Sequence, residues 1–357
     1  MRFGLWGVAF VFSAAGCASA PVDTIAAPTV PARAETAPVA SLEDAADDPA
    51  IWISPNGEGD GRILGTDKQA GLYVYDLTGA QTQFLPAGAL NNVDLRQDVQ
   101  TPAGPRDLAA ATNKTDNSVT LFQVDADGSV QEIGRFSTGL EEPYGLCVAN
   151  RAEGYRVYVT YKTGVVQAFS VFPDVDAIAQ ALPGLRFETQ LEGCVFDEAQ
   201  STLFVGEEAA GIWRIPFTGD QPGQPVMIDV VNSGTGLAAD VEGLDIWRGA
   251  GPSGYLVASA QGQDRFVVYE RAAPNRPIGV FSVGPSRDGT VDAVTGTDGL
   301  TVTSAALDGY PQGLLVVQDD VNALPGRQQN FKLVDWRDVE RSLAGQIGGA
   351  PPQRTLD

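Results

Sequence analysis

The sequence predicts an all-β protein whose single domain is a six-bladed β-propeller. Short apolar runs alternate with turn signals, and the 357 residues include 41 glycines and 23 prolines, which is typical of a strand-rich protein. A unit of three apolar strands recurs about every 50 residues, which is the period of a propeller blade. Six such units fill residues 48–336. A pair of β-sandwiches is the alternative, but the six units keep the same phase, which favours the propeller.

Each unit begins with one polar or acidic residue followed by small and apolar residues. A second apolar strand follows, and a third comes after a tight turn. The six opening residues are Asp48, Asn92, Tyr144, Glu192, Glu242 and Asp298. Only Asp174–Leu182 has a short helical pattern. We expect an N-terminal strand to close the ring as the outer strand of a late blade.

The two ends of the chain are predicted to lie outside the propeller, which we assign to residues 41–337. Residues 1–20 resemble an export signal, with Arg2, an apolar run too short to span a membrane, and small residues at its end. Two processing routes remain open: lipidation of Cys17 in the sequence AAGC, or ordinary cleavage before Pro21. The Pro/Ala-rich linker at 21–40 favours the lipoprotein. Residues 338–357 are expected to be a polar tail.

We therefore expect an exported protein that is periplasmic, anchored to the outer membrane as a lipoprotein, or secreted. A net charge of −22 disfavours nucleic acid and acidic lipid as partners. It also repels polyanionic small molecules unless bound cations intervene. Nothing in the sequence indicates a protein partner, so we expect a monomer. Cys147 and Cys194 form either a disulfide or two buried thiols, and the sequence does not distinguish these alternatives.

The opening residues predict a metal site, because the first strands of the blades line the central channel of a propeller. Asp240 and Asp292 lie just before two of them. Oxygen ligands in a chain without histidine suit Ca²⁺ better than zinc or copper. Alternatively, these residues are solvated acids in loops. That explanation suffices for any single residue, but eight oxygen-bearing residues at equivalent positions favour a metal site.

Lysines recur in phase at the end of the second strand in three consecutive units, as Lys68, Lys114 and Lys162. The next three units carry oxygen-bearing residues there: Glu207 with Glu208, Gln261, and Asp319 with Asp320. Lysine binds phosphate as a point charge, and bound metals can polarise a phosphate and activate water. The pattern therefore predicts binding or hydrolysis of a highly phosphorylated small molecule.

Nine blocks of the sequence, in order between residues 35 and 336, resemble β-propeller phytases. They include DAADDPAIW (44–52), TDKQAGLYVY (66–75), LNNVDLR (90–96), EEPYGLC (141–147), EGCVFDE (192–198), DVEGLDIW (240–247) and QNFKLVDW (329–336). The resemblance implies a Ca²⁺-dependent 3-phytase that hydrolyses phytate, myo-inositol hexakisphosphate, by attack of a metal-activated water without a phospho-enzyme.

The resemblance also implies roles for individual residues. Those expected to hold active-site calcium are Glu35, Tyr144, Glu192, Glu208, Asp240, Glu242, Gln261 and Asp292. Structural calcium sites would use Asp48 and Asn322. Phosphate contacts would come from Lys68, Lys114 and Lys162, with Gln69, Thr163 and Tyr144 beside the substrate, and the catalytic set would be the three lysines with Tyr144, Glu192 and Glu242.

Departures from the family pattern are Gln69, Thr163, Val321 and Lys114, where Lys, Glu, Glu and Arg respectively are common. Two other functions remain as alternatives. One is a calcium-dependent lactonase-type hydrolase on the same fold, which leaves the three lysines without a role. The other is a propeller that binds a ligand without catalysis.

Overall fold

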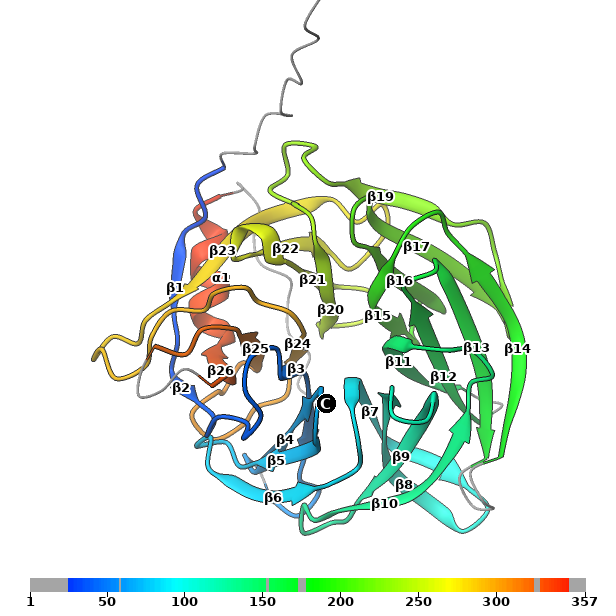
Figure 1. The fold of residues 1–357 in the computed structure, drawn as a ribbon. Coiled ribbons are helices and arrows are strands. Elements are labelled where there is room, and N and C mark those ends of the chain that lie inside the picture. The colour runs from blue at the N-terminus through cyan, green and yellow to red at the C-terminus, as the bar shows by residue number, and fades with distance from the viewer. Residues whose placement is uncertain (1–24, 58, 152–153, 173–177, 324–327, 347–357) are drawn as a thin grey trace, which may run out of the picture.

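The computed structural model describes residues 25–57, 59–151, 154–172, 178–323 and 328–346. Six antiparallel blades surround a central channel, and the first strand of each blade is innermost (Figure 1). The predicted all-β fold and the six-bladed propeller are confirmed. No helix in these ranges is long and apolar enough to cross a membrane.

The strands of the blades follow one another along the chain. Blade 1 is β3 (Ala46–Ile53), β4 (Gly61–Asp67), β5 (Gly71–Tyr75) and β6 (Gln81–Leu85). Blade 2 is β7 (Leu90–Thr101), β8 (Gly104–Asn113), β9 (Ser118–Val124) and β10 (Val130–Ser137). Blade 3 is β11 (Pro143–Arg151), β12 (Gly154–Tyr161), β13 (Val165–Phe172) and β14 (Ile178–Arg186).

The remaining blades carry additional elements. Blade 4 is β15 (Leu191–Asp197), β16 (Thr202–Glu207), β17 (Gly211–Thr218) and β19 (Val226–Val230), with the short β18 (Gln221–Pro222). Blade 5 is β20 (Val241–Arg248), β21 (Gly254–Ala260), the 3-10 turn η1 (Gln261–Gln263), β22 (Arg265–Glu270) and β23 (Pro277–Gly284). Blade 6 is β24 (Leu300–Thr303), β25 (Leu314–Asp319) and β26 (Asn330–Asp335).

The N-terminal segment closes the ring. β2 (Ala34–Glu35) pairs with β26 as the outer strand of blade 6, and β1 (Thr29–Pro31) runs parallel to β23 of blade 5 (Figure 1). The prediction of closure by an N-terminal strand is confirmed. The prediction of a linker at 21–40 is therefore wrong for the residues of β1 and β2. The sequence did not reveal these strands, because two or three residues are too few to show a period-2 pattern.

The C-terminal prediction also needs correction. A helix, α1 (Trp336–Ala344), begins after the N-cap Asp335 and buries Trp336, Val339 and Leu343 against blades 5 and 6. The proposed helix at Asp174–Leu182 is wrong from Ile178 onward, because that segment pairs with β13 as strand β14. The predicted export signal, Cys17 and the last eleven residues lie outside the described ranges.

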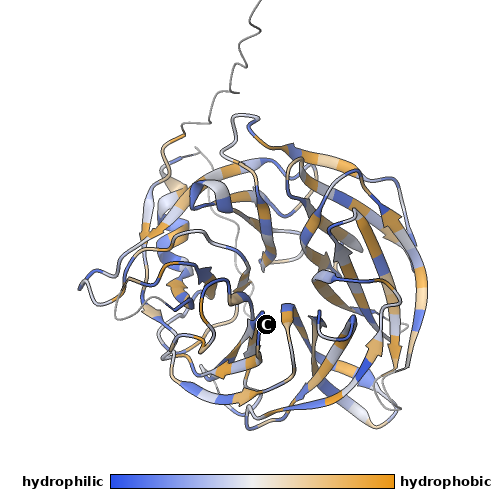
Figure 2. Cartoon of the chain, viewed as in Figure 1, coloured by the Kyte–Doolittle hydropathy of each residue, from blue (hydrophilic) through white to orange (hydrophobic). Residues whose placement is uncertain are grey.

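Hydrophobic clusters fill each space between neighbouring blades, and each cluster draws its buried side chains from two adjacent blades. Figure 2 shows hydrophobic residues distributed along the strands of every blade. Between blades 5 and 6, for example, the rings of Trp247 and Trp336 stack with their centroids 5.8 Å apart. This packing holds the six inner strands at fixed positions around the channel.

Candidate active site

A β-bulge interrupts the innermost ladder at the same point in blades 1 to 5. In blade 4 the register passes from Leu191–Glu207 to Cys194–Val205, which leaves Glu192 and Gly193 opposite the single residue Gly206. The same shift occurs in the other four blades. A bulge redirects a side chain out of the regular pleat. It therefore presents one residue of each of these five inner strands at the channel mouth.

The register corrects the predicted ring in the first two blades. Asp47 and Asn91, not Asp48 and Asn92, are equivalent to Glu192. The ring therefore consists of Asp47, Asn91, Tyr144, Glu192, Glu242 and Asp298. We call these six residues the ring residues.

The residue after each ring residue explains the error. In blades 3 to 6 it is glycine, and a Cβ added to Gly193 would lie only 1.8 Å from the carbonyl oxygen of Glu242 in the next blade. Blades 1 and 2 carry Asp48 and Asn92 there, so two adjacent polar residues obscured the phase. Aligning the glycine position across all six units would have revealed it.

Two buried acidic clusters share Glu192. Oxygen atoms of Asp47, Glu192 and Asp298 lie within 4.8 Å of one another, as do those of Glu192, Glu208 and Glu242. All five residues are at least nine-tenths buried. The sequence predicted Glu192, Glu208 and Glu242 as metal ligands but missed Asp47.

Burial and mutual repulsion perturb these carboxyl groups. Burial raises the pKa of Glu242 to about 8. A hydrogen bond with Glu192 opposes this shift, and nearby carboxylates reinforce it. Burial also raises the pKa of Glu208 to about 7. The pKa of Glu192 is raised well above its usual range, first by burial and then by Glu242 and Asp298. A bound cation would relieve this cost of ionisation.

The lysines lie beside the acidic clusters. Lys68 Nζ is 2.9 Å from both Asp298 Oδ2 and Asp44 Oδ1, and Lys114 Nζ donates to Asn91 Oδ1 at 2.7 Å. Lys162 Nζ lies 4.2 Å from the centre of the Tyr144 ring. The structure thus brings together the three predicted lysines and Tyr144.

Gln69 anchors the loop that carries Asp44. Its side-chain amide donates to the carbonyl oxygens of Leu42 and Asp44 at 2.8 and 3.1 Å. Thr163, by contrast, bonds through its carbonyl to Arg186 on the outer strand of blade 3. The sequence missed Asp44, whose place beside Lys68 depends on a loop conformation rather than on the repeat.

Asp240 and Gln261 lie at the edge of the second cluster. The Gln261 backbone N–H donates to the carbonyl of Asp240 at 3.0 Å, and its side chain donates to Gly296. The carboxylate of Asp240 raises the pKa of Glu208 through space. Asp240 therefore lies within electrostatic range of Glu208, and Gln261 is tied to the backbone of Asp240 and Gly296.

Glu35, Asp292 and Asn322 converge elsewhere, in blade 6. Lys332 Nζ contacts Glu35, lies 2.6 Å from Asp292 Oδ1 and 3.1 Å from Asp319 Oδ2, and is 3.5 Å from Asn322 Oδ1. We call this group the closure cluster, because Glu35 belongs to β2. The sequence did not identify Lys332 as part of it.

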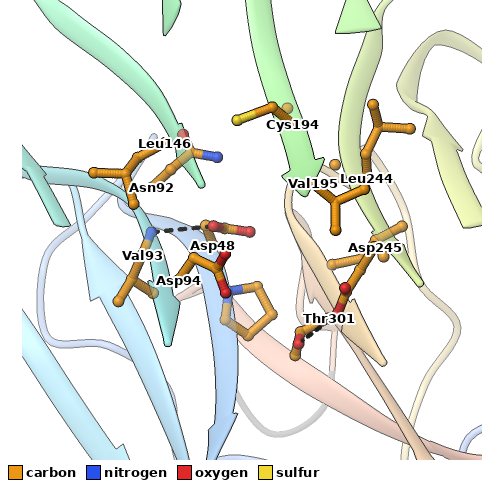
Figure 3. Close-up of a pocket in the computed structure, with 14 residues that line it drawn as sticks. Asp48, Asn92, Val93, Asp94, Leu146, Cys194, Val195, Leu244, Asp245 and Thr301 are labelled. Carbon is orange, nitrogen blue, oxygen red and sulfur yellow. Dashed lines mark hydrogen bonds between the residues drawn. The ribbon is translucent and has the colours of Figure 1, made fainter. Parts of the chain in front are cut away.

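Asp48 lies deeper in the channel, in a small pocket lined by all six inner strands (Figure 3). Its Oδ2 accepts a hydrogen bond from the Val93 N–H at 3.1 Å, and burial raises its pKa well above the usual range. The carboxyl group of Asp245 in the same pocket is bonded to Thr301. Asp48 is thus separate from the ring residues, as its assignment to a structural site requires.

Cys147 and Cys194 form a disulfide, with their Cα atoms 5.5 Å apart. It joins β11 to β15, the inner strands that carry Tyr144 and Glu192. The sequence had left the choice between a disulfide and free thiols open.

The acidic clusters fit a hard cation. Among the described residues, buried oxygens of Asp47, Glu192, Glu208 and Glu242 lack a hydrogen-bond donor. Unpaired buried carboxylate oxygens are costly, and Ca²⁺ takes six to eight oxygen ligands of this kind. The two clusters, Asp47 with Glu192 and Asp298 and Glu192 with Glu208 and Glu242, provide carboxylate oxygens of this kind.

Comparisons with known proteins identify the family of the chain. The model of the phytase family matches residues 5–348. The chain is 36% identical over 335 residues to a 3-phytase from Bacillus subtilis (strain 168), covering 88% of this chain and 85% of that protein. A solved structure of a functionally unknown protein from Desulfotomaculum acetoxidans DSM 771 has a TM-score of 0.47 at 13% identity, covering 65% of this chain and 70% of that one. On the family match and the curated relative, this chain belongs to the phytase family.

Proposed function

We propose that this protein is an exported, calcium-dependent phosphomonoesterase that hydrolyses phytate to lower inositol phosphates and phosphate. One observation carries the proposal: buried carboxylates with unpaired oxygens lie directly beside three lysines at the channel mouth. Hydrolysis of phytate accords with membership of the phytase family and with the 3-phytase relative. Export is proposed from the first 20 residues of the sequence alone.

The acidic clusters would hold the metal. Asp47, Glu192 and Asp298 would hold it on one side, and Glu192, Glu208 and Glu242 on the other, since Glu192 belongs to both clusters. Calcium held there would neutralise the charge of a phosphate and acidify a bound water. Without a cation, a net charge of −22 repels a polyanionic substrate.

The lysines would bind the phosphate on the other side. Lys162 is held by the face of the Tyr144 ring, and Lys114 by Asn91, so both ammonium groups are fixed before substrate arrives. Such pre-positioned cations stabilise the charge on the equatorial oxygens of a transferring phosphoryl group. The sequence contains no histidine, and both propeller cysteines are in a disulfide, so we propose direct attack by water.

The test is release of phosphate from phytate by purified protein in Ca²⁺, in EDTA, and in EDTA followed by excess Ca²⁺. We expect activity in Ca²⁺, its loss in EDTA and its recovery on readdition. A simple aryl phosphate serves as the comparison substrate and should be a poorer one, because it offers a single phosphate group. An unchanged rate in EDTA would contradict the calcium mechanism, and no turnover under any condition would favour a binding module.

A further inference from the structure

A set of buried hydroxyl groups lies directly behind the ring residues. Thr112 Oγ1 donates to the carbonyl oxygen of Tyr144 at 2.6 Å, and Thr160 Oγ1 donates to that of Glu192 at 2.6 Å. Ser259 Oγ donates to the carbonyl oxygen of Asp298 at 2.9 Å. Each hydroxyl comes from the second strand of one blade and reaches the ring residue of the next. All three are completely buried.

Two of these hydroxyls also accept a hydrogen bond from the inner strand of their own blade. The Asn92 N–H donates to Thr112 Oγ1 at 3.2 Å, and the Gly243 N–H donates to Ser259 Oγ at 2.8 Å. Thr112 therefore links the bulge of blade 2 to the bulge of blade 3, and Ser259 links the bulge of blade 5 to Asp298 at the start of blade 6. The Asp298 carbonyl also accepts from the Gly243 N–H at 3.3 Å, so there Ser259 adds a second donor. A bulge removes the ring residue from the regular ladder, so in blades 3 and 4 the hydroxyl provides its carbonyl with a donor.

The hydrogen bond from a second-strand hydroxyl to the next ring residue forms between some blades and not others. In blade 1 the equivalent residue is Thr66, whose hydroxyl bonds, within the described part of the chain, only to the backbone of Asp48 in its own blade. In blade 4 the equivalent is Gly206, where an added Cβ would lie 2.9 Å from the Val241 carbonyl. The linked residues are thus Tyr144, Glu192 and Asp298. Two of these three belong to the acidic clusters, and Glu192 belongs to both.

We propose that Thr112, Thr160 and Ser259 are positioning residues that fix the backbone of Tyr144, Glu192 and Asp298 and thereby set the spacing of the cation ligands. This inference rests on the proposed function. Thr160 holds the carbonyl group that is bonded to the Glu192 Cα, so loss of this hydrogen bond lets that Cα shift and carries the Glu192 carboxylate with it. At the same blade boundary the disulfide joins the two strands through Cys194, two residues further along, and does not bond to this carbonyl.

The test is calorimetric titration of Ca²⁺ into the metal-free form of the full protein. Thr160→Val keeps the side-chain shape and removes the hydroxyl, and we expect it to weaken calcium affinity about tenfold, as for loss of other groups that orient metal ligands. Thr160→Ser keeps the hydroxyl and should restore most of the affinity. The calcium midpoint of phosphate release should shift with the affinity, while kcat at saturating Ca²⁺ stays within about twofold of the wild type.

The matched control is Thr120→Val. Thr120 is also completely buried, but its hydroxyl accepts from the side chain of Asn113 within blade 2. It should lower stability without changing calcium affinity. Ser259→Ala, a smaller change, provides a second variant should Thr160→Val not fold, and it should weaken affinity through Asp298.

The outcomes separate the two proposals. Absence of calcium binding by the wild type would contradict the proposed function. Binding by the wild type with unchanged affinity in both Thr160→Val and Ser259→Ala would overturn the positioning role alone. An equal loss of affinity in Thr120→Val would also overturn it, because the effect would then reflect general destabilisation.

Discussion

The ring and the closure cluster are two groups of carboxylates that differ in how their charge is balanced within the chain. In the closure cluster Lys332 is completely buried, and its ammonium group contacts Glu35, Asp292 and Asp319. In the ring, oxygens of Asp47, Glu192, Glu208 and Glu242 have no hydrogen-bond donor among the described residues. The chain itself thus supplies a cation to the closure cluster, where Glu35 and Asp292 are partly buried, whereas the more deeply buried oxygens of the ring are the ones that the proposed calcium would pair.

The difference follows from what each group does. The closure cluster joins β2 to β26, so a cation built into the sequence holds the ring of blades together wherever the protein folds. The ring residues face the channel mouth, where an exchangeable cation can also contact a substrate. Lys68 is intermediate, since it contacts Asp298 and Asp44 of the chain but lies among the proposed phosphate ligands.

The largest effect is expected from Lys332→Met. Removing one partner of a buried ion pair leaves carboxylates without a counter-charge and typically costs about 3–5 kcal/mol. We expect a loss of that order in the free energy of unfolding, measured by denaturant titration in EDTA. The control is Lys162→Met, which should change this stability little. A loss below about 1 kcal/mol would show that the closure cluster does not depend on its internal cation.

The closure cluster also shows what sequence could and could not predict. The period of about 50 residues was enough for the six blades, and the phase of Lys68, Lys114 and Lys162 was enough to place them together. Lys332 was not predicted, because in an apolar strand pattern it resembles an ordinary strand residue. Its partner Glu35 is 297 residues away, and only closure of the ring brings the two together.

The ring of polar and acidic residues was predicted with an error of one residue in two blades. Hydrophobic patterning sets the phase of a strand, but a bulge inserts a residue without changing the pattern on either side. Asp47 and Asp48 are both polar and both buried, so composition did not distinguish them. Asp44 was missed for a different reason, since its place depends on the Gln69 side chain.

A second prediction concerns pH, with and without calcium. The folded-state pKa values of Glu208 and Glu242 are about 7 and about 8, above the value of about 4.3 for an unfolded glutamate. Between these values the folded state binds more protons than the unfolded state, so stability falls as pH rises from about 4 to 8. In EDTA we expect the free energy of unfolding to fall by several kcal/mol over this window.

Calcium should remove most of that loss, because a bound cation favours the ionised carboxylates. The measurement is calorimetric melting between pH 5 and pH 9 in EDTA and in excess Ca²⁺. Glu242→Gln should flatten the EDTA profile, since it removes one of the titrating groups. Identical pH profiles of stability in EDTA and in Ca²⁺ would contradict the difference proposed between the two groups, because the ring would then behave like the closure cluster.

The smallest change in stability is expected for Lys162→Met. Comparing this variant with Lys68→Met distinguishes the roles of the two lysines. Lys162 rests on the Tyr144 ring, whereas Lys68 neutralises Asp44 and Asp298. We expect Lys162→Met to raise KM for phytate about tenfold, equivalent to about 1.4 kcal/mol, with little change in stability in EDTA. Lys68→Met should weaken catalysis and also lower stability in EDTA, because two acids lose their counter-charge. If Lys162→Met is the more destabilising variant, then Lys162 is the internal cation of the ring and Lys68 the residue free to bind phosphate.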